Sequence, residues 1–319
     1  LKSINFFKGL GSYFDKVQRM RKIGGMISDE LLISREKVEL LASICKTDLT
    51  SDLVGEFPEL QGLMGGYFSE YQGFDKDISL AISEQYLPIG LNSMVPKKPF
   101  SFALSITDKI DTLVGFFGIN EKPTSSKDPL ALRRIALGVI RTCIENKKNL
   151  KINDLMNYSS RLYDEQGYNL DNKDLQKELY NFFKDRFKYY LKEKEIRYDI
   201  IEASLLSFSL NKLFSIFEKA KCLNQVIHSQ IGIDINSSYK RASNILESEM
   251  KNNEIEINDT TDPGIFKNDF EKNLYKKINE IKKYYSSINN DEDYVKSLSI
   301  LAEIKKEVFE FFDNVKVNE

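Results

Sequence analysis

Apolar residues recur at helical spacing along most of the chain, with polar residues between them. Early in the chain the repeat consists of Leu31, Leu32, Val38, Leu41 and Ile44. This spacing predicts a core helix over residues 26–45 that continues into residues 46–49. Asp128 followed by Pro129 is a helix-start signal, because Asp accepts free amide hydrogens and Pro lacks one. The residues that the following helix would turn inward are Leu130, Leu132, Ile135, Val139 and Ile140.

The second half of the chain carries longer apolar stripes. One stripe at i, i+4, i+7 spacing consists of Leu175, Leu179, Phe182, Phe183, Phe187, Tyr190 and Leu191. Another consists of Leu205, Phe208, Leu213, Ile216 and Phe217. A polar loop or linker is expected at 251–262, and two more helices at 265–287 and 291–314. No segment alternates apolar and polar residues for long, so the sequence predicts an all-α fold without a sheet.

Glycine and proline divide the chain into two parts. Thirteen of the 16 glycines and six of the 7 prolines lie at or before Gly138. The first part is therefore cut by frequent turns, whereas the second consists of long helices. We expect two helical domains, at residues 1–150 and 151–319.

Charge is unevenly distributed although the net charge is only −2. Residues 1–22 carry six basic side chains and one acidic, and residues 122–151 carry eight basic and two acidic. Residues 23–121 between them carry seven basic and fifteen acidic side chains. Two basic segments thus bracket an acidic one, which permits a local basic face on a nearly neutral molecule.

The scarcity of histidine and cysteine excludes several kinds of active site. His228 is the only histidine, and the three cysteines, Cys45, Cys143 and Cys222, are far apart. This composition disfavours a multi-histidine metal site, a structural zinc site and a disulfide framework, and it favours a reducing compartment such as the cytoplasm. No glycine-rich phosphate loop and no run long enough to cross a bilayer is found. The first residue is Leu1, which favours a piece of a longer protein.

Several motifs resemble a known family in both order and spacing. They are residues 45–49 (CKTDL), 54–62 (VGEFPELQG), 86–88 (YLP), 108–113 (DKIDTL), 123–134 (PTSSKDPLALRR), 240–246 (KRASNIL) and 311–317 (FFDNVKV). Together they resemble the bacterial glycyl-tRNA synthetase beta subunit over essentially the whole chain. The runs at 54–62 and 123–134 are long enough to make chance agreement very unlikely.

The resemblance implies a particular place in a larger enzyme. The family's beta subunit is longer, so this chain would be its C-terminal portion. Residues 1–150 would be an HD-type helical domain, and 151–319 a helical-bundle anticodon-binding-like domain, incomplete at its C-terminus. The family's alpha subunit carries the class II catalytic site, which uses ATP and Mg²⁺, and joins the beta subunit in an alpha2beta2 assembly that charges glycine tRNA. We therefore expect tRNA and the alpha subunit as partners, no DNA or membrane, and neither catalytic residues nor a cofactor in this chain.

The HD resemblance also places a metal site that this sequence has vacated. Its positions are Phe7, Thr47, Asp48, Gln85, Asp108 and Asp111. Asp108 and Asp111 share a helix face and could bind a cation, but aspartates without imidazoles leave too few ligands for a transition metal. An HD-type phosphohydrolase is therefore a weak alternative, and a helical scaffold that contacts only protein is another.

Basic clusters are the candidate tRNA contacts, because lysine and arginine bind backbone phosphates. The candidates are Lys127, Arg133, Arg134, Arg141, Arg19, Arg21, Lys22, Lys240 and Arg241. Pairing of Arg133 and Arg134 with Glu56 or Asp108 would make those two arginines structural instead. The carboxylates at residues 291–293 and Glu303 are candidates for reading the amines of anticodon cytosines.

Overall fold

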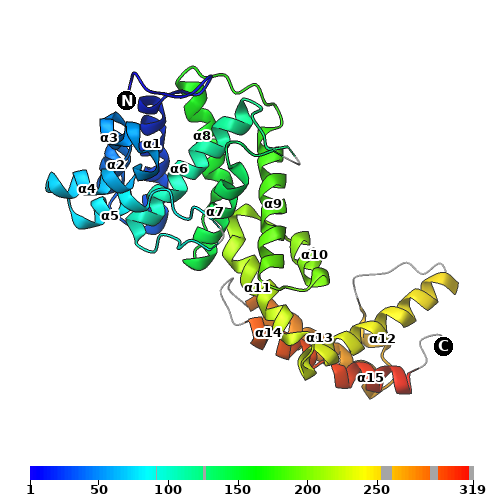
Figure 1. Cartoon of the computed structure of the whole chain (residues 1–319). Coiled ribbons are helices and arrows are strands. Elements are labelled where there is room, and N and C mark those ends of the chain that lie inside the picture. The colour runs from blue at the N-terminus through cyan, green and yellow to red at the C-terminus, as the bar shows by residue number, and fades with distance from the viewer. Residues whose placement is uncertain (91, 125–126, 253–260, 288–293, 316–319) are drawn as a thin grey trace. The chain divides into compact units, whose positions relative to one another are not determined.

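The computed structural model describes residues 1–90, 92–124, 127–252, 261–287 and 294–315 (Figure 1). Helices make up most of this part, which confirms the all-α class. The chain divides into two compact units, Leu1–Phe217 and Glu218–Glu319. This division lies well beyond the boundary expected near residue 150, because helices after that position pack against those of the first unit.

The first unit is built from short and medium helices and one small sheet. Its α-helices are α1 (Tyr13–Leu31), α2 (Arg35–Ile44), α3 (Asp52–Glu56), α4 (Leu63–Tyr71), α5 (Lys76–Glu84), α6 (Pro99–Gly118), α7 (Leu132–Glu145), α8 (Ile152–Glu165), α9 (Leu175–Glu193), α10 (Tyr198–Leu206) and the start of α11 (Leu213–Val226). Its 3-10 helices are η1 (Thr47–Thr50), η2 (Pro58–Leu60) and η3 (Leu210–Lys212). Strands β1 (Asn5–Phe7) and β2 (Gly11–Ser12) pair antiparallel, a sheet that the sequence did not predict because two or three residues are too few to alternate.

Helix α6 lies at the centre of the first unit (Figure 1). It packs against α1, α5, α7, α8 and α9, and almost every residue along it is buried. A hydrophobic core cluster fills the space between α1, α2, α5 and α6: Met20, Leu41, Ala42, Cys45, Ile78, Ala81, Ile82 and Leu104. The charged residues of α6, Asp108, Lys109 and Asp111, are therefore held in the buried interior of the first unit.

The core helix expected over 26–45 is two helices. Leu32 adopts a left-handed conformation (φ 56°), its amide hydrogen bonds to the end of α1, and α2 begins after Ser34, whose hydroxyl caps it. Leu32 was expected to face inward and is instead 92% exposed. The prediction was wrong because an apolar repeat does not reveal a left-handed backbone at a residue other than glycine.

The helix start expected at Asp128 is displaced by several residues. Helix α7 begins at Leu132, after Ala131 in a left-handed conformation (φ 55°). The Asp128 carboxylate still accepts the free amides, from Leu132 at 2.8 Å and Arg133 at 3.0 Å. The chemistry of the cap was therefore predicted correctly, although Pro129 lies outside the helix.

The apolar stripe of residues 175–191 is confirmed. Leu179, Phe183, Phe187 and Leu191 are fully buried along α9. The next stripe is also largely buried, but it is divided between α10, the turn at residues 207–209 and α11.

The second unit is a small helical bundle. It comprises the end of α11, then α12 (Gln230–Asn252), η4 (Pro263–Ile265), α13 (Asp269–Ser287), α14 (Tyr294–Ala302) and α15 (Lys305–Asn314). Helix α13 packs against α15, and α12 packs against both α14 and α15. The helix expected at 291–314 is broken between α14 and α15, and most of the expected loop at 251–262 lies outside the described residues.

Among the described helices, no single one is both long and apolar enough to cross a bilayer. One bent pair, Tyr198–Leu206 with Leu210–Val226, passes the same test of length and composition when its helices are combined.

Candidate functional site

Two aspartates of α6 lie at the centre of a buried charge cluster. Asp108 Oδ1 lies 2.9 Å from Lys46 Nζ and 3.4 Å from Lys16 Nζ. The Asp111 carboxylate accepts a hydrogen bond from Lys16 Nζ at 3.1 Å. It accepts two more from Arg19, from Nε at 2.7 Å and from Nη2 at 3.1 Å. Lys16, Arg19, Lys46 and Asp111 are all at most 2% exposed. Two carboxylates are thus enclosed by three cations from α1 and from the turn after α2.

The cations keep both aspartates ionised. Burial would raise the pKa of each carboxyl group, but the neighbouring charges outweigh it. Lys16 and Lys46 hold the pKa of Asp108 well below its ordinary value. Arg19 and Lys16 lower the pKa of Asp111 in the same way. The cluster is therefore a structural network in which both carboxylates stay ionised at neutral pH.

Arg19 uses its donors within this network. Besides Asp111, it donates to the Tyr163 hydroxyl at 3.0 Å and to Gln166 Oε1 at 2.7 Å, and it stacks 3.7 Å from the centre of the Tyr163 ring. Its burial contradicts the prediction that Arg19 contacts RNA. The spacing of basic residues in the sequence could not distinguish a guanidinium facing α6 from one facing solvent.

The remaining positions of the vacated metal site have structural roles. Phe7 packs edge-on against Phe116, with ring centres 4.9 Å apart. Thr47 is exposed and donates to Ile44 O at 2.8 Å. Asp48 accepts from the Gly62 amide at 2.6 Å.

Gln85 is fully buried and donates to two backbone carbonyls, Cys45 O at 2.8 Å and Ile82 O at 2.9 Å. Within the described part of the chain, no group of three or more His, Cys, Asp or Glu side chains is placed to hold a metal ion. The residues present do not fit a metal, because lysine and arginine already neutralise Asp108 and Asp111, two of the three carboxylates at these positions.

Sequence reasoning missed Lys16 and Lys46, which fill this cluster. A usable signal exists in α6, where Asp108, Lys109 and Asp111 are the only charged residues between Pro99 and Gly118. Charges inside such an apolar segment must be paired, because an unpaired buried charge is very unfavourable. The partners come from distant segments, so the sequence does not identify them.

The basic residues before and within α7 differ in whether their side chains are free to contact phosphate. Lys127 and Arg134 are exposed, and among the described residues their side chains have no hydrogen-bond or ion-pair partner. Arg133 donates to Thr124 O and is partly exposed. Neither arginine pairs with Glu56 or Asp108. All three therefore remain candidates for phosphate contact.

Arg141, in contrast, is 7% exposed and structural. It pairs with Glu145 at 2.9 Å and donates to Gly90 O and Ser93 O at 2.6 and 2.8 Å. This placement contradicts the prediction that Arg141 shares an RNA-binding face with Arg134.

The other two basic clusters are only partly free. Lys22 pairs with Glu165 at 2.8 Å, and Arg21 lies 3.8 Å from Glu39, both near the surface. In the second unit Lys240 is exposed, whereas Arg241 pairs with Asp313 and lies 4.6 Å from the centre of the Phe309 ring.

Of the carboxylates considered for anticodon reading, Glu303 pairs with Lys277 at 2.6 Å. Residues 291–293 lie outside the described residues.

Two family models match separate parts of this chain. Residues 235–319 match the DALR anticodon binding domain, which marks a tRNA-related protein. Residues 1–206 match the model described as glycyl-tRNA synthetase beta subunit. The chain belongs to this family, which confirms the resemblance seen in its motifs.

Individual relatives agree with the family match. The chain is 34% identical over 318 residues to the glycine–tRNA ligase beta subunit of Cereibacter sphaeroides, covering all of this chain and 46% of that protein. It is 36% identical over 320 residues to the corresponding subunit of Rickettsia canadensis, covering 45% of that protein. The chain thus spans about half the length of the curated relatives it matches.

Proposed function

We propose that this chain is the tRNA-engaging, non-catalytic portion of a glycine–tRNA ligase beta subunit. The observation that carries this proposal is the pair of family matches, to the beta subunit over 1–206 and to an anticodon binding domain over 235–319. The charge cluster supports the non-catalytic role, because Asp108 and Asp111 are neutralised by buried cations of the protein.

The rest of the enzyme would come from a partner. We propose that an alpha subunit supplies the catalytic site with ATP and Mg²⁺, in an alpha2beta2 assembly in the cytoplasm. The names of the relatives as beta subunits support the existence of a subunit partner.

The cations proposed to contact RNA in the first unit are Lys127, Arg133 and Arg134, with Arg21 and Lys22 at a second place. Lys240 and Arg241 have this role in the second unit. Lys127, Arg134 and Lys240 are the strongest of these, because they are exposed and no other residue in the described part of the chain neutralises their charges.

The test is tRNA binding as a function of salt concentration. Binding of glycine tRNA should weaken steeply with salt, because each phosphate contact releases counterions. The double change Lys127→Glu and Arg134→Glu should reduce the salt slope by about 2, because each cation that no longer binds a phosphate lowers it by roughly one. The control is Lys148→Glu, which changes an exposed cation three residues beyond the C-terminal end of α7. Binding that does not respond to salt would contradict the proposal.

Glycine charging tests the non-catalytic role. The chain alone should not charge tRNA, and charging should require an alpha subunit and the rest of the beta subunit. Nucleotide hydrolysis by the purified chain that depends on added metal would instead support the phosphohydrolase alternative.

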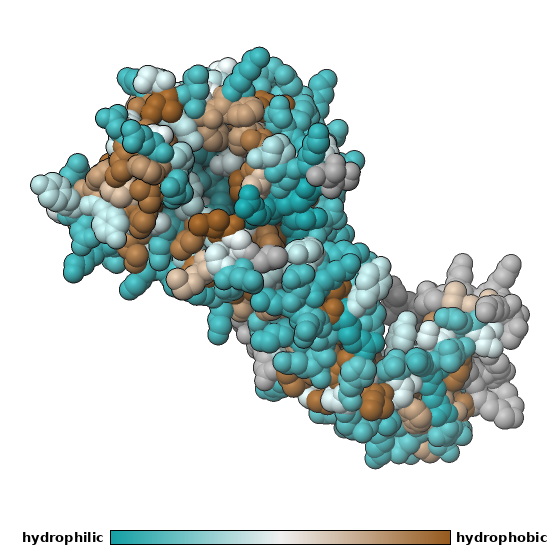
Figure 2. All heavy atoms as spheres, in the orientation of Figure 1, coloured by the Kyte–Doolittle hydropathy of each residue, from teal (hydrophilic) through white to brown (hydrophobic). Residues whose placement is uncertain are grey.

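A protein-interaction role has one observation in its favour. Large apolar side chains are exposed along α3, α4 and α5: Leu53, Phe57, Leu63, Tyr67, Tyr71 and Leu80. Figure 2 shows apolar surface over this side of the first unit. Such a patch is typical of a protein contact, so introducing a charge with Tyr71→Glu should weaken assembly with the alpha subunit if this face is used.

A further inference from the structure

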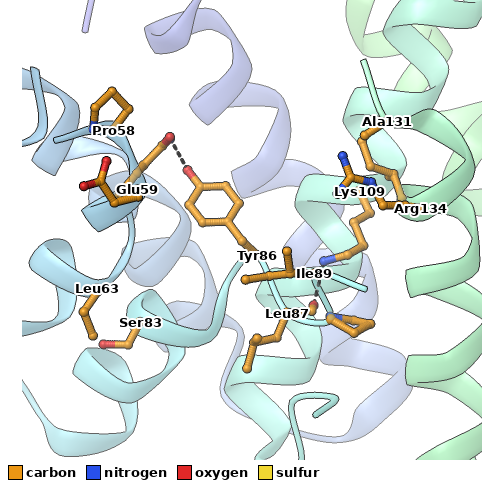
Figure 3. A pocket seen from close by; sticks show the side chains of 13 residues that line it. Pro58, Glu59, Leu63, Ser83, Tyr86, Leu87, Ile89, Lys109, Ala131 and Arg134 are labelled. Carbon is orange, nitrogen blue, oxygen red and sulfur yellow. Dashed lines mark hydrogen bonds between the residues drawn. The ribbon is translucent and has the colours of Figure 1, made fainter. Parts of the chain in front are cut away.

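A pocket of about 410 Å³ opens on the surface of the first unit (Figure 3). One side is formed by η2 and the start of α4, and the other by α6 and the start of α7. Figure 2 shows the same face of the first unit as hollowed. Its volume lies within the range of roughly 300–1,000 Å³ that is usual for small-ligand sites. Its walls are mixed, with Pro58, Leu63 and Ile89 as apolar members and several polar groups among them.

Tyr86 is a rigid aromatic surface in this pocket. Its hydroxyl accepts a hydrogen bond from Lys46 Nζ at 2.9 Å and another from the Gln61 side-chain amide. The Lys46 ammonium also lies 4.2 Å from the ring centre. The ring is therefore fixed by the buried charge cluster before any ligand arrives. A fixed aromatic ring is a favourable stacking surface for a base that has left its own stack.

One wall of the pocket carries two basic side chains, those of Arg134 and Lys109. Arg134 reaches it from the first turn of α7, and no other described residue neutralises its guanidinium group. Lys109 reaches it from α6 and is 4% exposed. Its ammonium donates to Leu87 O and Ser105 Oγ, both at 2.7 Å. In the ammonium form, Lys109 retains a third hydrogen for a ligand, since lysine has three donors. This wall suits a phosphate group.

The opposite wall carries a free acceptor. Glu59 follows Pro58 in η2 and is exposed, and among the described residues its carboxylate has no partner. Figure 3 shows Glu59 on the far side of Tyr86 from Lys109 and Arg134. A carboxylate in this place can accept hydrogen bonds from the exocyclic amine of a base, as cytosine offers, whereas uracil has no such amine.

Across the pocket these three features follow the order of the parts of one nucleotide: a place for the phosphate, a flat ring for the base and an acceptor for the amine (Figure 3). We propose that the pocket takes one unstacked, amine-bearing nucleotide of the bound RNA, with its phosphate at Arg134 and Lys109, its base on Tyr86 and its amine at Glu59. This inference rests on the proposed function, since it assumes that RNA reaches this face. It adds a base-reading site to backbone contacts that carry no sequence information.

The test compares short single-stranded RNAs. Labelled oligocytidylate and oligouridylate are titrated into the whole 319-residue chain, and binding is followed by fluorescence anisotropy. The unmodified chain should prefer oligocytidylate by about fivefold or more, the usual discrimination from a specific base contact. Glu59→Gln should abolish most of this preference. Free cytidine monophosphate should compete only weakly if the site serves RNA, and fully if it serves a free nucleotide, which would overturn the RNA assignment.

Matched variants separate the pocket from general charge effects. Glu56→Gln removes an exposed carboxylate three residues away that does not line the pocket, so it should keep the preference. Arg134→Ala should weaken binding of both RNAs, and filling the pocket with Ile89→Trp should do the same. Circular dichroism of each variant confirms that the fold is retained.

The outcomes separate the pocket from the wider tRNA contact. A Glu59→Gln chain that keeps the full preference, or an unmodified chain without one, would overturn the pocket and leave the proposed tRNA contact intact. If the pocket variants lose assembly with the alpha subunit but keep their RNA discrimination, the pocket binds a protein segment. That result would overturn the inference. Absence of salt-dependent RNA binding by the unmodified chain would remove the proposed function itself.

Discussion

At the scale of single residues, the first unit depends on charges placed deep inside it. Asp111 has both carboxylate oxygens paired with buried cations, and Asp108 lies between two ammonium groups. Such a network adds little net stability over a well-packed apolar core, but removing one member leaves the others uncompensated. Lys46 of this network also donates to the Tyr86 hydroxyl in the pocket wall, so the stability of the core and the position of Tyr86 both depend on it.

Replacing Asp111 with Asn should destabilise the chain by about 3–5 kcal/mol, because Arg19 and Lys16 would lose a buried counter-charge. Urea unfolding followed by circular dichroism measures the change. The control is Glu165→Gln, which removes the exposed partner of Lys22 and should cost less than about 1 kcal/mol. Similar decreases in stability for the two variants would contradict the structural role of the cluster.

Lys109 should make stability depend on pH. Burial lowers the pKa of Lys109 from 10.5 to about 7, and Asp108 opposes this only in part. Above pH 7 the folded chain loses this proton while the unfolded chain keeps it, so stability should rise with pH, by up to about 1.4 kcal/mol per pH unit. The window is pH 7 to about 8, below the titration of unfolded cysteine, whose ordinary pKa is about 8.5, and of tyrosine.

Unfolding free energies measured across this window should show the rise in the unmodified chain. Lys109→Met should make the profile flat, because the titrating group is gone. A rise of equal slope in the variant would assign the effect to another group.

At the scale of elements, apolar spacing predicted helices well and their ends poorly. Helix α9 was predicted because its stripe is long and unbroken. The break between α1 and α2 and the start of α7 were missed because each depends on a left-handed residue, Leu32 and Ala131. Their side chains give no sign of this conformation, because neither leucine nor alanine favours it. For the charge cluster, the sequence indicates the buried charges of α6 but not their partners, since Lys16 and Lys46 lie far from α6 in sequence.

The start of α7 offers a test at this scale. Asp128→Ala should reduce stability by about 1 kcal/mol, because two amides of the first turn lose their acceptor. It should also weaken RNA binding, since Arg133 and Arg134 lie in that turn. Thermal unfolding and RNA titration measure the two effects. Asp185→Ala, on the exposed face of α9, should change neither.

At the scale of the whole molecule, the two compact units agree with the two family matches. The matches cover 1–206 and 235–319, and the units meet between Phe217 and Glu218. The sequence-based boundary near 150 followed the loss of glycine and proline. That change marks longer helices within the first unit, since α8 and α9 pack against α6.

A fragment of residues 1–226, which ends where α11 ends, should therefore fold alone and unfold cooperatively in urea. It should also retain the preference for oligocytidylate, because every residue of the pocket lies within it. A gradual, non-cooperative transition would show that the first unit needs the rest of the chain.

The buried lysines have a consequence for how the subunit is produced. When buried carboxylates need a bound metal ion for stability, the folded fraction of the protein depends on the free concentration of that ion. Here the positive charges that neutralise Asp108 and Asp111 belong to the polypeptide itself, on Lys16, Arg19 and Lys46. Folding of this unit should thus be a one-component reaction, unaffected by chelators, and a cell starved of divalent metals would still make it in its native form.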